Sequence, residues 1–340
     1  MFFLISLQEY MEGLRYNYVI FGLPGIFGVC YKDVIELENV LFFTNSFYEG
    51  LSGVRKFAAK AANSPRLPSF INRLFACFSY PNVYKLDFDN DHPVCVILFG
   101  PRYWFCQTFY FEYIKKKFPS CKFVLYYQDK VMKSSPEFDP RFAKRRFDLI
   151  YSYDRSDCEK YCLIYYPTPY SMYSIPENSS FPEVDVFFCG AAKDRRQIIE
   201  DSFLKLRSLG LVCDFFINYA SEGCPRIEGI HYNEYMEYEE YLQRLSRAKV
   251  ILDVMQGGAD GFTMRLWESM MYGKHLLTNN ESIRSSRFYD PSRVHFLDSD
   301  LSEMPFLKDR PVHVPVSEKL ALSPVNLLRD IESRLCDNNS

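Results

Sequence analysis

The sequence predicts an α/β protein made of two Rossmann-like domains that face a cleft. Short apolar runs typical of buried strands alternate with helical patterns of apolar residues along the 340-residue chain. Glycine-rich turns separate several of these strands from the helices that follow them, as in βαβ units. Prolines are dense between residues 167 and 182, near the middle of the chain. Prolines at that density do not belong inside a helix or strand, so we expect a linker there.

The first half supplies one predicted domain, residues 1–170. Its helix after Gly100 and Pro101 should end at the lysines 115–117, because cations there complement the helix dipole. Residues 128–130 follow a predicted strand directly, at the sheet edge where open α/β sheets carry functional groups. The expected strands cover residues 18–21, 40–44, 83–86, 94–99, 123–127, 149–151 and 163–165.

The second half supplies a second predicted domain, residues 183–322, and a final helix in the segment 323–340. Ser323 and Pro324 have the residue types that begin a helix. Gly273 should end the helix before it in a left-handed conformation. The expected strands cover 184–189, 212–217, 250–254 and 275–278, and the expected helices cover 195–209, 234–247 and 262–272.

Composition narrows the class of protein. Hydrophobic residues make up 48% and charged residues 24%, as in a globular protein, and a net charge of −3 gives no reason to expect nucleic acid as a partner. The 11 scattered cysteines favour reduced thiols. No apolar run reaches the ~20 residues of a membrane span, and the first residues lack a basic n-region. We therefore expect a cytoplasmic protein.

A cationic turn follows the first strand of the second half. Residues 190–196, Gly-Ala-Ala-Lys-Asp-Arg-Arg, lead from that strand into a helix. Free N–H groups at a helix start attract anions, and cations at that end are disfavoured by ~0.3–1 kcal/mol each unless an anion is bound. We interpret Gly190, Lys193, Arg195 and Arg196 as a diphosphate site. The alternative is a solvated helix start whose cations serve solubility.

Two carboxylates lie in the glycine-rich βαβ unit at 250–280. Asp260 is in the turn and Glu268 is on the following helix, seven residues further on. Taken alone, Glu268 could be an exposed carboxylate paired with Arg265, worth a few tenths of a kcal/mol. Taken alone, Asp260 could be a turn or N-cap residue.

Two further segments have two interpretations each. Residues 87–91, Asp-Phe-Asp-Asn-Asp, contain the D-x-D pattern of divalent-metal sites, but His92 and Leu98 do not fit a calcium loop. We favour a polar turn there and expect no metal. Residues 55–78 interleave cations with apolar side chains. They could lie on an anionic membrane, but a core helix with a charged outer face is the interpretation we favour.

The stretch 256–280 resembles glycosyltransferases of the GT-B fold, and within them bacterial lipopolysaccharide and capsule biosynthesis proteins. Their pattern is matched by Gln256, Gly261, Arg265, Glu268, Gly273, Lys274, Thr278 and Asn279. The spacing of Asp260 and Glu268 also resembles the E-x7-E motif of retaining members, with Asp in place of the first Glu. The resemblance implies that Asp260 faces the transferred sugar, that Glu268 binds the nucleotide ribose, and that the final helix returns to the first domain.

From the residues and the resemblance together we expect a metal-independent, retaining, hexosyltransferase-like enzyme that needs no cofactor. It would move a sugar from a nucleotide-activated donor to a saccharide or lipid-linked acceptor in cell-surface polysaccharide synthesis, in peripheral contact with the inner face of the plasma membrane. Asp129 would be the general base if the enzyme inverts. The alternatives are a sugar-nucleotide epimerase of the same fold and a non-catalytic scaffold. The expected donor-binding residues are Gly190, Lys193, Arg195, Arg196, Gln256, Gly261, Phe262, Thr263, Arg265 and Glu268.

Overall fold

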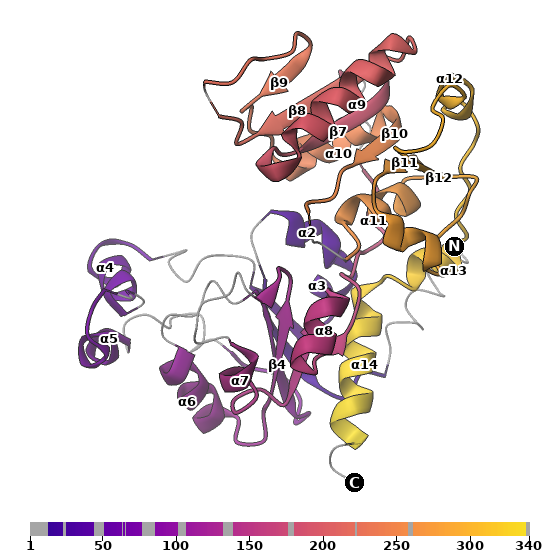
Figure 1. The fold of residues 1–340 in the computed structure, drawn as a ribbon. Helices are drawn as coiled ribbons and strands as arrows, with labels where there is room; N and C mark the ends of the chain where they lie inside the picture. Colours follow the sequence, from indigo (N-terminus) through magenta and orange to yellow (C-terminus); the bar gives the residue numbers. More distant parts are fainter. Residues whose placement is uncertain are drawn as a thin grey trace. The chain divides into compact units, whose positions relative to one another are not determined.

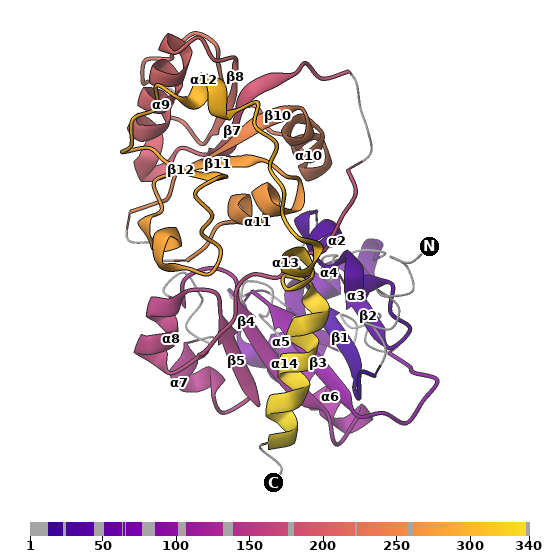
Figure 2. The same ribbon diagram turned by 90° about the vertical axis from the view of Figure 1, so that its right-hand side faces the viewer.

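A computed structural model of the chain divides it into two compact units. Unit 1 comprises residues 1–171 and 323–340, and unit 2 comprises residues 172–322. Figures 1 and 2 show the elements of both from two directions. The structure describes residues 13–22, 25–43, 51–62, 64, 66–76, 86–100, 107–131, 139–175, 180–221, 223–257 and 261–337.

Unit 1 is built on a parallel six-stranded sheet in the order β2-β1-β3-β4-β5-β6. The central strands are buried along their length because both faces of such a sheet are covered. Its strands are β1 (Asn17–Phe21), β2 (Val40–Phe43), β3 (Val94–Phe99), β4 (Lys122–Tyr127), β5 (Leu149–Ser152) and β6 (Ile164–Tyr165). Its helices are α2 (Ile26–Cys30), α3 (Lys32–Ile35), α4 (Gly53–Ala62), α5 (Ser69–Ala76), α6 (Gln107–Lys117), α7 (Pro140–Ala143) and α8 (Arg155–Tyr161).

Unit 2 has a second parallel six-stranded sheet, in the order β12-β11-β10-β7-β8-β9. Its strands are β7 (Val184–Ala191), β8 (Cys213–Asn218), β9 (Ile230–Tyr232), β10 (Ala248–Asp253), β11 (His275–Thr278) and β12 (Val294–Phe296). Its α-helices are α9 (Arg196–Ser208), α10 (Tyr238–Ser246), α11 (Met264–Met271), α12 (Met304–Leu307) and α13 (Val316–Leu320), and its 3-10 turns are η5 (Lys193–Arg195) and η6 (Glu281–Ser285). The short strands β9 and β12 were not predicted.

The final helix, α14 (Pro324–Asp337), packs on unit 1. Glu332 is buried and accepts hydrogen bonds from the Tyr18 hydroxyl on β1 and from the backbone N–H of Arg15. Asp330 accepts a hydrogen bond of 2.7 Å from the Tyr151 hydroxyl on β5. The helix is therefore bonded to both of these strands, and Figure 2 draws it lying along the sheet. Two Rossmann-like sheets and a final helix that returns to the first unit confirm these parts of the predicted fold.

Several sequence predictions can be compared directly with these elements. The lysines 115–117 do end α6, and Gly273 does end α11 with a φ of 61°. The strand expected at 83–86 and the helix start at 101–106 lie outside the described residues, except Leu86, which is not in a strand. The acidic segment 87–91 forms an exposed bend before β3, where the Asn90 side chain accepts hydrogen bonds from His92 and from Asn17. It is the polar turn that we favoured.

The interpretation of residues 55–78 as a core helix is wrong for the described part. The segment forms two helices, α4 and α5, and large apolar side chains on them face solvent. The faces that pack inward on α4 consist of alanines at positions 58, 59, 61 and 62. On α5, Phe75 does pack against the apolar cluster of unit 1, whereas Phe70 and Leu74 are exposed.

Candidate functional site

The order of strands in unit 2 identifies the edge where a ligand is expected. From β7 the chain moves outward through β8 and β9, and it then returns to β10 on the other side of β7 before continuing to β11 and β12. The boundary between β7 and β10 is therefore the topological switch point. Ligands of open α/β sheets bind beyond the carboxyl ends of the strands at such a point. Gly190 lies near the carboxyl end of β7, and Asp253 ends β10.

Arg265 bridges the two strands of this switch point. It stands in the first turn of α11, and its Nη2 donates a hydrogen bond to the backbone carbonyl of Cys189 on β7. Its Nη1 lies 3.7 Å from Oδ1 of Asp253 on β10. The guanidinium also packs over the Phe188 ring, with its central carbon 5.3 Å from the ring centroid. The Arg265 side chain is thus largely buried between β7 and β10.

Arg195 bridges the same two strands from the other loop. Its Nε donates to the carbonyl of Ala191, the last residue of β7, at 3.1 Å, and its Nη1 donates to the carbonyl of Val254 after β10. Burial lowers the pKa of Arg195 to about 10, and the positive charge of Arg265 adds to this shift. Two cations are therefore held close together in a region that water reaches poorly.

Gly190 is the point on which both guanidinium groups converge. A Cβ atom placed on it would lie 2.8 Å from Nη2 of Arg265 and 3.3 Å from Nη2 of Arg195. Any side chain at position 190 would displace at least one of these groups. The need for glycine here is therefore one of space rather than of backbone conformation.

The loop after β7 has a backbone conformation suited to anions. Ala192 is right-handed helical and Lys193 has a positive φ of 44°. Successive residues of this kind occur in the backbone nests that bind anions, although the N–H of Ala192 itself donates to the carbonyl of Asn218 at 2.7 Å. Asp194 holds the loop in place, because its Oδ2 accepts a hydrogen bond of 2.9 Å from the N–H of Gly257. The loops after β7 and β10, the second of which contains Gln256, are thereby joined.

Glu268 on α11 is buried, whereas an exposed carboxylate was one interpretation of the sequence. It is only 1% exposed, and its two oxygens accept hydrogen bonds from the hydroxyls of Tyr238 at 2.8 Å and Tyr241 at 2.5 Å. Burial raises the pKa of its carboxyl above the ordinary value. The interpretation as an exposed partner of Arg265 is therefore wrong, because α10 covers this face of α11 and the ion pair of Arg265 is with Asp253.

Asp253 belongs to the site although sequence reasoning gave it no role. It is fully buried, and its Oδ2 accepts a hydrogen bond of 3.1 Å from the Thr278 hydroxyl on β11. Burial raises the pKa of its carboxyl as well. The signal in the sequence was a charged residue inside the apolar run 250–254, since a charge at such a position requires a partner.

Other predicted donor-binding residues have different surroundings. Arg196 pairs with Glu200 at 2.7 Å and stacks over the Tyr232 ring, so its guanidinium is directed toward β9. Phe262 is buried, and its ring makes edge contacts with Trp267 and Phe288. These two side chains therefore contribute to packing within unit 2.

The remaining predicted residues divide between the turn before α11 and unit 1. The carbonyl of Gly261 accepts a hydrogen bond from the Asn280 side chain, and Thr263 occupies the N-cap position of α11. Asp260, the predicted contact to the transferred sugar, lies outside the described residues. Asp129 follows β4 in unit 1 and is half-buried.

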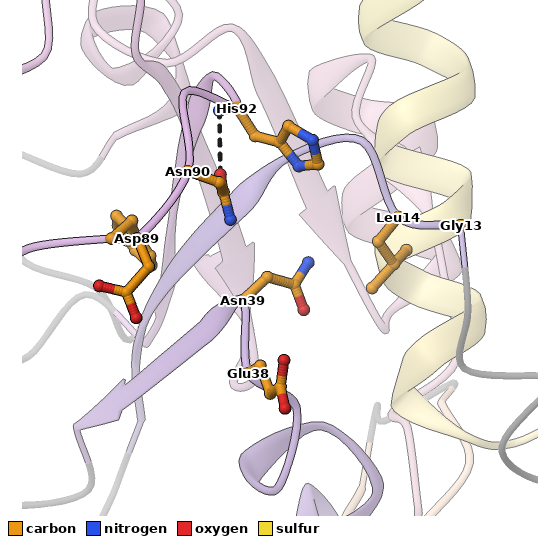
Figure 3. A pocket seen from close by; sticks show the side chains of 8 residues that line it. Gly13, Leu14, Glu38, Asn39, Asp89, Asn90 and His92 are labelled. Atoms are coloured by element: carbon orange, nitrogen blue, oxygen red, sulfur yellow. Dashed lines mark hydrogen bonds between the residues drawn. The ribbon is translucent and has the colours of Figure 1, made fainter.

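A hollow in unit 1 lies at the amino ends of its strands, whereas the site in unit 2 lies at carboxyl ends. Figure 3 shows its lining, and its volume is about 290 Å³. The lining residues precede β1, β2 and β3, so the hollow is at the amino ends of these parallel strands: Gly13, Leu14, Glu38, Asn39, Phe88, Asp89, Asn90 and His92. Among the residues described in the structure, no group of three or more His, Cys, Asp or Glu side chains could hold a metal ion. We assign this hollow no role.

No family model and no curated protein matches the chain. Among solved structures, the chain is similar to α,α-trehalose 6-phosphate synthase from Burkholderia multivorans, at 10% identity and a TM-score of 0.48 over 96% of this chain and 99% of that one. It is also similar to the Gap123 glycosylation-associated protein complex from Streptococcus agalactiae, at 7% identity and a TM-score of 0.41 over 77% of this chain. It spans 55% of that matched chain. A third is a protein from Listeria monocytogenes named as a putative UDP-N-acetylglucosamine 2-epimerase, at 11% identity and a TM-score of 0.36 over 82% of this chain and 74% of that one. At these scores we draw nothing about activity from them.

Proposed function

We propose that the chain is a glycosyltransferase that binds a nucleotide-activated sugar at the β7/β10 switch point of unit 2. The observation that carries this proposal is the convergence of Arg195 and Arg265 over Gly190. The two cations lie beside the αR–αL turn at Ala192 and Lys193, a backbone conformation that occurs in anion-binding nests. All of these groups are at the sheet edge where α/β proteins bind nucleotides.

The reaction class follows from what such a site stabilises. When the bond between the anomeric carbon and the diphosphate breaks, negative charge develops on the leaving phosphate oxygens. Fixed guanidinium groups of low exposure stabilise that charge without reorganising, which lowers the barrier for transfer. Lys193 would add a third positive charge. In this proposal the charge is balanced by protein cations, so no metal is required.

The finer parts of the proposal come from the resemblance stated above. Asp260 would face the transferred sugar, the outcome would be retention at the anomeric carbon, and the donor would carry a hexose. The acceptor would be a saccharide or a lipid-linked sugar in cell-surface polysaccharide synthesis. Contact with the inner face of the plasma membrane would bring the chain to such an acceptor. If the enzyme inverts instead, Asp129 is the side chain that we propose as general base.

The same guanidinium groups also bond strand carbonyls, so a purely structural clamp is the competing explanation. A thermal-shift screen of nucleoside diphosphates and their sugars separates the two, because a ligand at 100 times its Kd stabilises the folded state by about 2.7 kcal/mol. We expect nucleotides of one particular base to raise the melting temperature, and we expect Lys193→Ala to reduce that rise. If no nucleotide stabilises the protein at millimolar concentration, the proposal is wrong.

A second assay distinguishes transfer from epimerisation. The stabilising nucleotide sugar is incubated with the protein alone and then with acceptor saccharides. Release of nucleoside diphosphate that requires acceptor supports transfer. Conversion of the donor to a new nucleotide sugar without any acceptor would replace this proposal with an epimerase.

A further inference from the structure

Large apolar side chains on the helices α4 and α5 face solvent, although such side chains are usually buried. Phe57 on α4 is 67% exposed and Phe70 on α5 is 72% exposed, and Val54 and Leu74 are exposed to a similar degree. Val54 and Phe57 are three residues apart and Phe70 and Leu74 four apart, so each pair lies on one side of its helix. The inward side chains of α4 are alanines. Four large apolar side chains of this hairpin thus face solvent.

The hairpin is nevertheless a fixed part of unit 1. Asn72 on α5 donates hydrogen bonds to the carbonyls of Ala62 at 2.9 Å and Ser64 at 2.8 Å, which holds the two helices together. The rings of Phe57 and Phe75 meet edge to face across the hairpin, with centroids 6.4 Å apart. Ala62 is part of an apolar cluster in the core of unit 1, and Phe75 packs against that cluster. Figure 1 shows the two helices next to each other.

The charge of the hairpin is of one sign. Residues 51–76 contain five Lys and Arg residues and no Asp or Glu, although the whole chain has a net charge of −3. The exposed cations are Arg55, Lys56, Lys60 and Arg66. Within the described part of the chain, none of these four side chains has an ion pair. The positive charge around the exposed apolar groups is therefore not neutralised by neighbouring carboxylates there.

We propose that the hairpin α4–α5 binds the surface of a membrane rich in anionic lipid. Large apolar side chains enter the boundary between headgroups and acyl chains, while the surrounding cations attract anionic headgroups. The helices have ten and eight residues, far short of the ~20 that span a bilayer, so the contact is peripheral. A nucleic acid would match the cations but leave the aliphatic side chains of Val54 and Leu74 without a partner, and the net charge disfavours it.

The inference names the surface and the lipid chemistry for the membrane contact included in the proposed function. It can nevertheless be tested without donor or acceptor, so its failure and the failure of glycosyl transfer are distinguishable. The full-length protein is sedimented with two kinds of phosphatidylcholine vesicle, one with roughly 30% phosphatidylglycerol and one with none. The anionic fraction is chosen to approximate the charge of a cytoplasmic leaflet. We expect binding to the anionic vesicles only, with weaker binding in high salt.

Variants separate the apolar from the charged contribution. Phe57→Ser, Phe70→Ser and Leu74→Ser combined should reduce partitioning by at least about tenfold, since exposed side chains of this size supply the apolar area. Arg55→Gln with Lys60→Gln should reduce it about 25-fold at low salt, roughly fivefold for each cation. The matched control removes exposed apolar groups of unit 2, with Leu204→Ser, Tyr235→Ser and Phe306→Ser, and should bind as the wild type does.

Depth of insertion gives an independent readout. In Phe70→Trp, the indole should be quenched by brominated lipid in anionic vesicles, after the signal of the wild type is subtracted. Unchanged unfolding midpoints show that the serine variants fold. Failure of the wild type to bind anionic vesicles, equal binding to neutral vesicles, or full binding by the triple hairpin variant each overturn the inference. So does a single-stranded RNA that binds this hairpin while the vesicles do not.

Discussion

Removing the Glu268 carboxylate tests the core of the candidate site. Its two oxygens are the acceptors for the hydroxyls of Tyr238 and Tyr241, and Tyr241 is itself buried. Glu268→Ala would leave these hydroxyls without that acceptor and would open a cavity between α10 and α11. The change therefore removes interactions and creates unpaired polar groups at the same time.

The expected loss of stability is large because the group is buried. A hydrogen bond to a charged group contributes about 1.5–3 kcal/mol, and a buried hydroxyl left without a partner costs about 1–3 kcal/mol. These terms overlap, and the carboxylate itself is expensive to bury. We expect Glu268→Ala to lower the free energy of unfolding of unit 2 by about 3–5 kcal/mol. An exposed helix carboxylate would have cost under about 0.5 kcal/mol.

Trp267 gives a local reporter for this measurement. It is fully buried on the same helix, and the chain has only one other tryptophan, Trp104. In a Trp104→Phe background, urea unfolding followed by fluorescence reports on unit 2. The matched control is Glu239→Ala on α10, which removes an exposed carboxylate and should change stability by less than about 0.5 kcal/mol. A loss below about 1 kcal/mol in Glu268→Ala, within the range of a typical substitution, would show that the tyrosine contacts contribute little.

Glu268→Gln separates stability from ligand binding. The amide preserves the volume of the side chain and retains hydrogen bonding to the tyrosines, so the protein should remain folded at 25 °C. If the carboxylate also accepts hydrogen bonds from a ribose, nucleotide affinity measured by calorimetry should fall roughly 10- to 100-fold. Unchanged affinity in Glu268→Gln would leave this carboxylate a purely structural role.

Three other predictions concern separate parts of the chain. Gly190→Ala places a methyl group 2.8 Å from Nη2 of Arg265, so it should cost about 1–3 kcal/mol of stability and weaken nucleotide binding. Its control is Gly28→Ala in α2, where the added methyl group meets nothing within 4 Å. Equal melting temperatures of the two variants would contradict the crowding at Gly190. Limited proteolysis should cut first within 167–182, and the two fragments should co-elute under native conditions because α14 packs on unit 1; early cuts elsewhere with this segment intact would count against the boundary near residue 171. His295 lies 3.1 Å from His275, and burial followed by the charge of His275 lowers the pKa of His295 to about 4. The folded-state pKa of His295 is below the unfolded value of about 6.5, so the folded state binds fewer protons. The free energy of unfolding should therefore fall as pH drops from about 6.5 toward 4. His295→Gln should reduce this dependence on pH, and an unchanged dependence in chemical unfolding at several pH values would contradict the role of His295.

The sequence was informative where local pattern determines structure. The strands β7, β10 and β11 are apolar runs next to glycine turns, and each was predicted to within two residues at either end. The strands β9 and β12 have three residues each, too few for a period to be recognised. The convergence at Gly190 was predicted only as a group of cations near one turn, because the position of Arg265 relative to β7 depends on the order of strands in the sheet.

The sequence did not reveal which side chains on α4, α5 and α11 are buried. Glu268 reads as a surface residue on α11, yet its hydroxyl partners come from α10, 27 and 30 residues earlier in the chain. The reverse error occurred on α4 and α5, where Phe57, Phe70 and Leu74 face solvent while alanines fill the inner face of α4. In both cases the identity of the packing neighbour decided the outcome, and no local period contains that information.

The return of α14 to unit 1 has a consequence for synthesis of the protein on the ribosome. Unit 2 is continuous in sequence, so all of its strands emerge in one uninterrupted stretch and can pair as translation proceeds. Unit 1 is made first but lacks the helix that accepts the hydrogen bonds of Tyr18 and Tyr151 until residues 324–337 have been translated. The part of the first sheet that α14 covers therefore stays uncovered by it throughout the synthesis of unit 2. The unit that begins to emerge first can therefore be completed only after all of unit 2 has been translated.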